Sequence, residues 1–305
     1  MVRPFRFGVQ ATNLDRPAAI VSAAKQAEAL GYDEFFSYDH FGAEDPFIPL
    51  MLAAEVTSRL RLGPLVLNNE FHHPALLART AATVDRLTGG RLVLGFGTGY
   101  DQAEHDAIGV LLRDPPERVR RLEDCLIAVR CLLDTGAMTM TGQHHNLAVS
   151  ELGIRPVQAC VPFLIGGNGR RLIEVAARHA HIFQFTGLSH GVNGAPRLDG
   201  FRFEAVAERN RWFMRAAGHR LATVERSVLV QVCHIGHGAH ERNQALLQEW
   251  GFDLRTVQRT PFALVGSIRQ VVDKLEWLRD ELGVNHVVVR DAEGFAPIVA
   301  ALAGR

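Results

Sequence analysis

Lysine is almost absent from this chain of 305 residues. Only Lys25 and Lys274 occur among the 33 lysine and arginine residues, and both fall in segments with helical periodicity. An aldolase that forms a Schiff base in a barrel needs a lysine at the end of a strand. The chain offers no such lysine, so this class of enzyme is excluded.

Cysteine is scarce as well, and its spacing carries no known motif. The four cysteines form no C-x-x-C pair, and two of them, Cys125 and Cys131, lie on one predicted helix. This usage is typical of a reduced, cytoplasmic protein. Histidine gives no metal site either, because the pairs His72-His73 and His144-His145 are adjacent in sequence and point in different directions. We therefore expect no bound metal.

Neither an excess of charge nor a long apolar run marks this sequence. Acidic and basic residues balance at 33 each, and no basic stripe or polybasic segment is present. The first six residues lack the apolar core of a signal peptide, and no run is long enough to span a bilayer. We therefore expect a cytoplasmic protein whose partner is a small-molecule substrate rather than nucleic acid or a membrane.

What the sequence does contain is a regular alternation of strand-like and helix-like segments. Its hydrophobic content of 47% is enough for a large core. Eight strands that alternate with helices, without a linker, predict an α/β fold with a single (β/α)8 TIM barrel domain over residues 1–305; a doubly wound sheet is the alternative. We predict strands at 5–10, 34–38, 61–67, 91–94, 163–166, 182–185, 227–235 and 287–290, and helices at 17–30, 49–58, 74–87, 116–133, 169–179, 201–217, 244–250, 268–282 and 295–302.

Two long connections interrupt this alternation, so we predict insertions after helix 4 and strand 6. The first, 134–162, contains Met138, Met140 and His144-His145, which indicate a small hairpin. The second, 186–200, is rich in glycine and follows the sixth strand, which places it on the C-terminal face of the barrel. Long loops on that face are often lids, so 186–200 is a candidate lid.

A short strand followed by glycines forms the most informative stretch. Residues 92–94 are apolar on both faces, as in a strand of a buried parallel sheet. Gly95, Gly97 and Gly99 then allow the backbone to approach a large ligand closely. The segment is not the dinucleotide-binding fingerprint, because Tyr100 stands where that pattern needs glycine or alanine. It predicts one wall of a cofactor site of another kind.

Polar residues follow the second and third predicted strands, at the functional end of a barrel. Asp39 and His40 end the second strand, and a histidine there can exchange protons near neutral pH. Asn68, Asn69 and Glu70 follow the third strand. The alternatives are a helix cap for the first pair and ordinary turn chemistry for the second group.

A second glycine segment follows the fifth predicted strand. Gly166, Gly167 and Asn168 lead into a helix whose first backbone N–H groups, with Arg170 and Arg171, would suit a phosphate. Close packing of the helix on the strand, with exposed arginines, is the alternative.

Taken together, these segments resemble the luciferase-like monooxygenase superfamily, and most of all its branch of oxidoreductases that depend on coenzyme F420, a deazaflavin. The resemblance spans nearly the whole chain. It implies a (β/α)8 barrel that binds coenzyme F420, with FMN as the alternative, and that transfers a hydride between the cofactor and a small organic substrate. The segments that carry it are 39–41, 60–63, 73–79, 82–91, 95–99 with Glu104, 166–169 and 265–267.

The resemblance also implies roles for individual residues. Asp39 and His40 would lie beside the cofactor ring, with His40 as the catalytic acid or base or as a residue that orients the substrate. The Leu65–Val66 bond matches a non-proline cis peptide that supports the back of the ring. Glu104 is expected to pair with an arginine. The remaining implied cofactor contacts are Thr98, Gly99 and Tyr100 along the ring or ribityl chain, and Gly166, Gly167 and Asn168 at the phosphate.

Departures from the family pattern reduce the range of substrates that we expect. The branch that oxidises a sugar phosphate carries a tryptophan and a glutamate where this chain has Glu44 and Tyr100, so that substrate is not expected. An apolar substrate pocket is the hypothesis that replaces it, although aromatic residues are more often plain core. Its four candidate phenylalanines are Phe41, Phe47, Phe71 and Phe185.

Three alternatives to this function stay open on the sequence. They are an FMN-dependent luciferase-like monooxygenase that uses reduced flavin and oxygen, a non-catalytic flavin-binding protein, and an unrelated phosphate-binding barrel enzyme. Members of the family are often dimers, so the resemblance also implies a homodimer.

Overall fold

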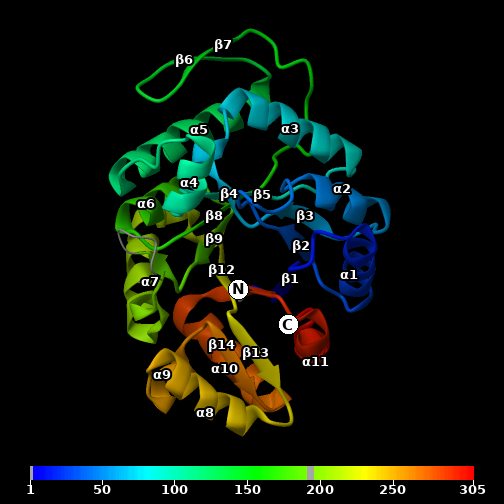
Figure 1. Ribbon diagram of the computed structural model, residues 1–305, viewed down its shortest axis with the longest axis vertical. Helices are drawn as coiled ribbons and strands as arrows, with labels where there is room; N and C mark the ends of the chain where they lie inside the picture. Colours follow the sequence, from blue (N-terminus) through cyan, green and yellow to red (C-terminus); the bar gives the residue numbers. More distant parts are fainter. Residues whose placement is uncertain (1–2, 191–195) are drawn as a thin grey trace.

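A parallel sheet closed into a barrel forms the centre of the fold (Figure 1). The computed structural model describes residues 3–190 and 196–305. Within these ranges nine parallel strands are hydrogen-bonded in the order β3-β2-β1-β15-β12-β9-β8-β5-β4, and a bridge between Leu62 and Leu92 completes the ring. The strands are β1 (Arg6–Gln10), β2 (Glu34–Ser37), β3 (Arg61–Pro64), β4 (Leu67–Asn68), β5 (Leu94–Gly97), β8 (Phe163–Gly167), β9 (Ile182–Phe185), β12 (Glu225–Leu229) and β15 (Val284–Val289).

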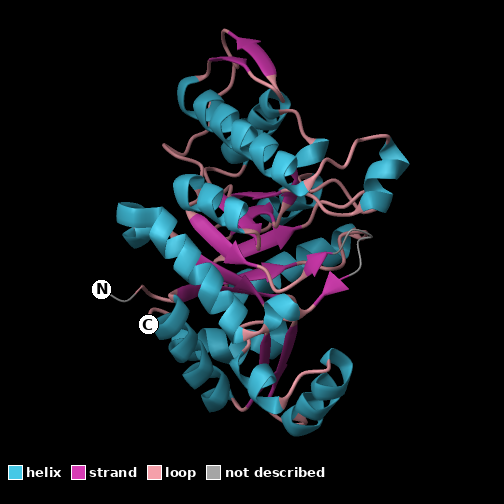
Figure 2. Ribbon diagram, turned by 90° about the vertical axis from the view of Figure 1, so that its left-hand side faces the viewer, coloured by secondary structure: helices cyan, strands magenta, loops and turns pink. Residues whose placement is uncertain are grey.

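This ring confirms the predicted (β/α)8 barrel. Strands β3 and β4 are the two parts of the predicted third strand, 61–67, so the sheet has eight strand positions around the ring. Helices cover its outside, as Figure 1 and Figure 2 show from two sides. They are α1 (Pro17–Ala29), α2 (Ile48–Glu55), α3 (Pro74–Leu87), α5 (Pro115–Thr135), α6 (Arg170–His179), α7 (Phe203–Ala217), α10 (Ile268–Leu282) and α11 (Ala292–Leu302).

Local sequence signals set the ends of these helices. Proline occupies the first turn of α1, α2, α3 and α5, where its missing N–H costs nothing. Helix α10 begins with a capping box, in which Ser267 and Gln270 each bond the backbone of the other, and ends at Gly283 in the left-handed conformation. These signals explain why the predicted ranges 74–87 and 268–282 match the structure at both ends.

Buried phenylalanines fill the layer between strands and helices. Phe7 of β1 packs edge-on against Phe295 of α11, with ring centroids 5.7 Å apart, and Phe183 of β9 stacks on Phe213 of α7 at 4.7 Å. All four side chains are buried. Each contributes on the order of 1.5–3 kcal/mol through burial, which fixes the helices to the barrel wall.

A buried charged cluster closes the N-terminal end of the barrel. Arg6 pairs with Glu34 and, at 2.8 Å, with Glu225, and Nε2 of His286 lies 3.1 Å from Glu34. Burial lowers the pKa of His286 to about 4, and the nearby Arg6 cation acts in the same direction. Because Arg6, Glu34 and Glu225 begin their strands, this cluster leaves only the opposite end open for a ligand.

Both predicted insertions are present. After α5, β6 (Met138–Thr141) and β7 (Asn146–Val149) form the predicted antiparallel hairpin, at the top of Figure 1. After β9, the short strands β10 (Ser189–His190) and β11 (Pro196–Arg197) pair with each other. Residues 191–195 of the candidate lid lie outside the described residues, so the lid stays a prediction.

The predicted strand 227–235 is wrong in its second half. The chain leaves the barrel after β12, because the N–H of Val230 still bonds Val288 whereas that of Gln231 bonds Phe262. Strand β13 (Val232–Ile235) then pairs with β14 (Ala263–Gly266). With helices α8 (Ala239–Trp250) and α9 (Leu254–Arg259) they form an insertion at the bottom of Figure 1. The predicted helix 244–250 is the second half of α8, and the rest of the insertion was not predicted. One apolar run therefore serves two sheets.

The predicted fourth strand, 91–94, is displaced towards the C-terminus. Strand β5 includes Gly95 and Gly97, which the sequence had placed in a loop. A Cβ atom on Gly95 would collide with the carbonyl oxygen of Pro64, and one on Gly97 would lie 2.6 Å from Cγ2 of Val66. Gly95 and Gly97 thus let β5 approach the neighbouring segment 64–66 closely.

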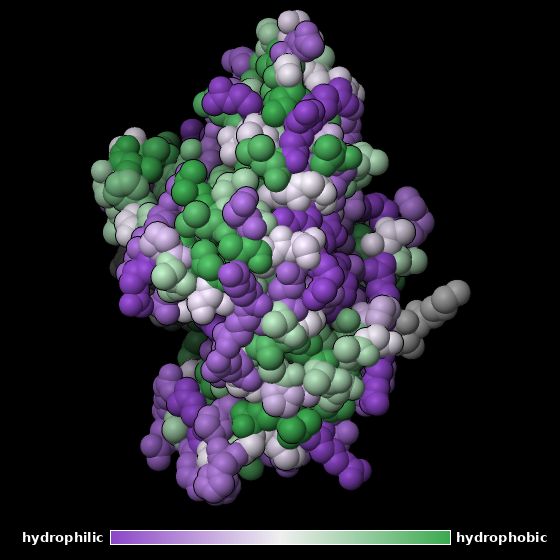
Figure 3. Space-filling view, turned by 90° about the vertical axis from the view of Figure 1, so that its right-hand side faces the viewer, coloured by the Kyte–Doolittle hydropathy of each residue, from purple (hydrophilic) through white to green (hydrophobic). Residues whose placement is uncertain are grey.

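The surface shows no single large apolar face in the view of Figure 3, where hydrophobic patches alternate with hydrophilic side chains. The first and last described segments of the chain lie side by side (Figure 1), and the N–H of Phe5 donates to the carbonyl oxygen of Arg305 at 2.8 Å. Of the helices in the described ranges, none combines the length and the apolar character needed to cross a membrane.

Candidate active site

A cavity of about 810 Å³ opens at the C-terminal ends of the barrel strands. Residues at or just after the ends of all eight strand positions line it, which is where barrel enzymes hold their substrates. Its volume lies in the range of clefts that hold drug-sized ligands and cofactors. All ten residues predicted for the site line this cavity: Asp39, His40, Leu65, Val66, Thr98, Gly99, Tyr100, Gly166, Gly167 and Asn168.

His40 is held by a carboxylate from the segment that follows β5. Its Nδ1 lies 2.6 Å from Oε1 of Glu104, and Oε2 of Glu104 accepts the N–H of Phe41 at 3.1 Å. Helix α4 (Gln102–Ile108), which the sequence analysis missed, places Glu104 in its first turn, and the side chain of Asp101 caps that turn. The predicted pairing of Glu104 with an arginine is therefore wrong.

Two tyrosines flank His40. The ring of Tyr100 lies edge-on to the imidazole with centroids 5.9 Å apart, and that of Tyr38 lies at 6.1 Å. Burial raises the pKa of both tyrosines, so their hydroxyl groups stay protonated at neutral pH. With Nδ1 bonded to Glu104, Nε2 is the nitrogen of His40 that remains for proton exchange.

Asp39 connects the end of β2 to the segment after β4. Its Oδ2 accepts the backbone N–H of Asn68 and contacts Nε2 of His72, each at 2.8 Å. Asn68 lines the cavity, whereas Asn69 and Glu70 are buried outside it. Glu70 pairs with two arginines of the α5 region, Arg113 at 2.5 Å and Arg121 at 3.4 Å, so it is a structural residue.

The predicted cis peptide bond between Leu65 and Val66 is confirmed. The amide of Gln10 on β1 donates to the carbonyl oxygen of Leu65 at 2.8 Å across the barrel mouth. The side chain of Val66 packs against Gly95 and Gly97 of β5. This wall of the cavity is therefore formed by the backbone of β5 and by Val66, without large side chains.

The segment after β8 forms another wall. The side chain of Asn168 is fixed, because its Oδ1 accepts the hydroxyl of Thr186 at 2.6 Å and its Nδ2 donates to the carbonyl oxygen of Leu188 at 2.5 Å. No side chain caps the N-terminus of α6, and a Cβ on Gly169 would meet nothing within 4 Å. Open space therefore lies before that helix N-terminus.

Arg170 and Arg171 do not take part in this wall. Neither lines the cavity, and Nε of Arg170 lies 3.1 Å from Glu174 one helical turn further along. Their contribution to a phosphate site stays a prediction, whereas residues 166–169 of the turn do line the cavity.

The four phenylalanines predicted for an apolar pocket do not line the cavity. Phe185 and Phe47 are buried in the core, and Phe41 is exposed. The apolar lining comes from other residues, namely Tyr38, Leu65, Val66, Leu67, Tyr100, Val119, Leu172, Leu188 and Leu229.

Several polar residues of the cavity were missed by the sequence analysis. Gln10 and Arg290 are the last residues of two predicted strands, so their position at the C-terminal face could have identified them. Arg118 and Gln231 carried no such signal, because they lie inside a helix and inside the wrongly extended seventh strand.

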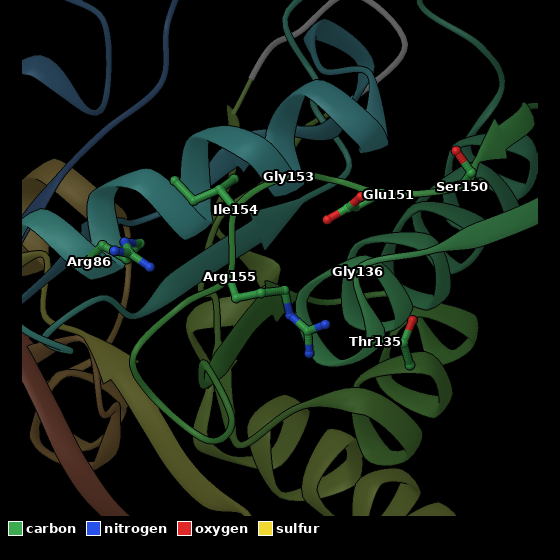
Figure 4. A pocket seen from close by; sticks show the side chains of 8 residues that line it. All are labelled: Arg86, Thr135, Gly136, Ser150, Glu151, Gly153, Ile154 and Arg155. Carbon is green, nitrogen blue, oxygen red and sulfur yellow. The ribbon is translucent and has the colours of Figure 1, made fainter.

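A second cavity, of about 510 Å³, lies away from this site (Figure 4). Its lining comes from the ends of α3 and α5 and from the segment after β7. Arg155 is bonded there to the carbonyl oxygens of Leu133 and Asp134, so it caps α5. None of the predicted site residues lines this cavity.

Comparisons with known proteins agree with this architecture. A family model described as luciferase-like monooxygenase matches residues 1–259. The chain is 30% identical over 153 residues to 5,10-methylenetetrahydromethanopterin reductase of Archaeoglobus fulgidus, covering 50% of this chain and 44% of the relative. It is 30% identical over 186 residues to F420-dependent glucose-6-phosphate dehydrogenase of Kineococcus radiotolerans, covering 58% and 55%. The alignments span about half the length of these curated relatives.

A solved structure extends the likeness over the whole fold. The coenzyme F420-dependent tetrahydromethanopterin reductase from Methanopyrus kandleri superposes with a TM-score of 0.77 at 20% identity, covering 98% of each chain. At this identity the likeness shows the fold alone, but the family model matches most of the sequence as well. The chain belongs to the luciferase-like monooxygenase family.

Proposed function

We propose that this protein is an oxidoreductase that binds coenzyme F420 in the barrel cavity and transfers a hydride between it and a small organic substrate. The observation that carries the proposal is the His40–Glu104 pair at the mouth of a cavity lined by all ten residues expected from the family resemblance. Relatives named as F420-dependent, at 30% identity, support the choice of cofactor.

The residues present fit such a cofactor. The cavity is large enough for a ring system with a side chain. The uncapped N-terminus of α6, with open space before Gly169, offers backbone N–H groups to a phosphate. Leu65, Val66 and Thr98 to Tyr100 would hold the ring and ribityl chain, and Gly166, Gly167 and Asn168 the phosphate end. Bound there, the deazaflavin supplies hydride transfer at its C5 position.

The protein's own contribution is positioning and proton transfer. His40, oriented by Glu104, exchanges a proton with the substrate atom next to the carbon that gains or loses hydride. Asp39 holds the strand end that carries His40, through Asn68 and His72. The apolar walls exclude water from the reacting atoms.

A spectroscopic screen tests this function. Oxidised and reduced F420 are incubated with the protein and with alcohols, activated alkenes and imines, and the deazaflavin absorbance is followed. We expect turnover with at least one class, and its loss in His40→Ala. Turnover only with reduced FMN and oxygen would contradict the proposal in favour of a monooxygenase. Cofactor binding without any turnover would favour a non-catalytic flavin-binding protein.

We also infer a homodimer, which the family resemblance implies. Ile48 and Leu52 of α2 and Leu76 of α3 are exposed hydrophobic side chains that such an interface would bury. Light scattering at micromolar concentration tests the assembly: a mass twice that of the 33.6-kDa chain supports the dimer, and the mass of one chain contradicts it.

A further inference from the structure

The carboxylates of the cavity are hydrogen-bonded by other groups of the protein. Asp39 accepts hydrogen bonds from Asn68 and contacts His72, Asp101 caps α4, and Glu104 pairs with His40. Each of these acidic groups therefore has hydrogen-bond partners within the protein.

Arg290 of the same cavity is held only by neutral side chains. Its Nε donates to Oε1 of Gln10 at 3.0 Å, and its Nη1 donates to Oε1 of Gln231 at 3.1 Å. Both acceptors are neutral. Among the residues whose side chains the structure describes, no carboxylate lies within ion-pair distance of this guanidinium. Arg290 therefore brings one uncompensated positive charge to the rim of the cavity.

The two glutamines hold the guanidinium in one orientation. Nε2 of Gln10 is bonded to the carbonyl oxygen of Leu65, and Nε2 of Gln231 to that of Leu229. Each amide thus has its nitrogen engaged and must present its oxygen to Arg290. Partial burial lowers the pKa of Arg290, and no neighbouring acid opposes this shift. Nη2 keeps its donors for a ligand.

Arg290 follows β15, which is not adjacent in the ring to the strands that carry the proposed ribityl and phosphate contacts. In the ring of strands, β15 is separated from β5 by β12, β9 and β8 on one side, and from β4 by β1, β2 and β3 on the other. Of the segments proposed for the cofactor, Thr98 to Tyr100 follow β5 and Gly166 to Asn168 follow β8. Leu65 and Val66 lie between β3 and β4, and Asp39 follows β2. The half of the cavity next to Arg290 is instead lined by Gln10, Gln231 and the apolar Leu229.

We propose that Arg290 binds the carboxylate of the substrate, and that the enzyme acts on small organic acids with an apolar body. The statement that the enzyme acts on such acids rests on the proposed function, whereas the binding of a carboxylate by Arg290 does not. A guanidinium recognises a planar carboxylate through paired N–H groups, and a single positive charge matches a single negative one. Leu229 beside it would contact the apolar part of the molecule.

Binding of matched acid and amide pairs tests the proposal. Acetate, crotonate, benzoate and cinnamate are each compared with their primary amides by calorimetric titration, with and without F420. We expect at least one acid to bind tenfold or more tightly than its amide. Arg290→Met, which keeps side-chain length but removes the charge, should reduce that preference to twofold or less.

Arg118→Met is the matched control, because Arg118 also lines the cavity but bonds the carbonyl oxygen of Gly99 on the cofactor side. It should leave the preference for the acid intact. Absence of a preference in every pair, its persistence in Arg290→Met, or tighter binding of phenyl phosphate than of benzoate by tenfold would overturn the carboxylate site. So would a tenfold loss of F420 affinity in Arg290→Met, which would assign the cation to the cofactor.

The failure of the proposed function gives a different pattern. If F420 does not bind but the acid preference and its loss in Arg290→Met are observed, the anion site is supported and the cofactor assignment is wrong.

Discussion

Nδ1 of His40 lies 2.6 Å from a carboxylate oxygen of Glu104, although the two residues are 64 positions apart in the chain. His40 follows β2, and Glu104 comes from the first turn of α4, after β5. The second oxygen of the carboxylate binds the N–H of Phe41, so the acid is fixed at both oxygens. A histidine held in this way presents its other nitrogen to the cavity in one tautomer.

Removing either partner should slow the reaction to different extents. His40→Ala should lower kcat by about 100-fold or more, the contribution typical of general acid–base catalysis. Glu104→Ala should lower kcat by about 10–100-fold with little change in F420 affinity, as for other groups that orient a functional histidine.

Glu104→Gln is the matched variant, since its amide oxygen can still accept from Nδ1, and it should recover part of the activity. Steady-state kinetics and F420 titration separate these effects. Equal losses in Glu104→Ala and Glu104→Gln, or a loss confined to cofactor affinity, would argue against a positioning role.

The Asp39–His72 contact should stabilise the fold. Asp39→Asn replaces the carboxylate oxygen that accepts both hydrogen bonds by the oxygen of a neutral amide, which is a weaker acceptor, and we expect a loss of about 1–3 kcal/mol in the free energy of unfolding. Urea denaturation of Asp39→Asn, His72→Ala and the double variant measures the coupling. Additive losses would show that the two side chains do not interact.

The contact between Gly97 and Val66 predicts a compensating pair. Gly97→Ala places a methyl group 2.6 Å from Cγ2 of Val66, and overpacking of this kind costs typically 1–3 kcal/mol. Val66→Ala should recover part of this loss in the double variant.

Gly169→Ala serves as the control for the glycine substitutions, since its Cβ would meet nothing within 4 Å. Thermal unfolding is the measurement. If Gly97→Ala is as stable as Gly169→Ala, the close approach of β5 to Val66 is not present.

The buried His286 predicts acid sensitivity. Its pKa is lowered to about 4 by burial, whereas that of an exposed histidine is near 6.5. Between these values the unfolded chain binds more protons than the folded one, so this contribution to stability is complete above pH 6.5 and declines as the pH falls towards 4. Removing one such group reduces the slope of the free energy of unfolding against pH by at most about 1.4 kcal/mol per pH unit.

Urea unfolding from pH 7 to pH 4.5 measures this slope. His286→Gln should show a weaker dependence on pH than the wild type, and substitution of the exposed His240 by Gln should leave the dependence unchanged. Identical slopes for wild type and His286→Gln would contradict the prediction.

The barrel and the lining of its cavity were predictable because both follow local rules. The hydrophobic periodicity and the helix-capping residues located the strands and helices. The C-terminal ends of the strands of a parallel barrel lie at the same face, whatever segments connect the strands. The pairing of Glu104 was not predictable, because it depends on the short helix α4 and on a contact across the barrel mouth. The sequence likewise could not show that Gly95 and Gly97 lie against the neighbouring segment 64–66.

The prediction of the seventh strand was wrong for another physical reason. An apolar run such as 227–235 is compatible with one long strand or with two strands in different sheets, and only the partner of Gln231 decides between them. The prediction that four phenylalanines line the pocket was wrong for a similar reason, because an apolar ring is equally compatible with the core and with the wall of a pocket.

The central claim is that the cavity is a coenzyme F420 site, and direct titration of the purified protein tests it. F420 and FMN are titrated separately, with cofactor fluorescence as the signal, into wild type and into Gly166→Val, whose side chain would enter the cavity between Val66 and Gln184. We predict saturable binding of F420 at micromolar or lower concentration, at least tenfold weaker binding of FMN, and loss of F420 affinity in Gly166→Val. Tight binding of FMN with none of F420, or F420 binding unchanged in Gly166→Val, would contradict the account.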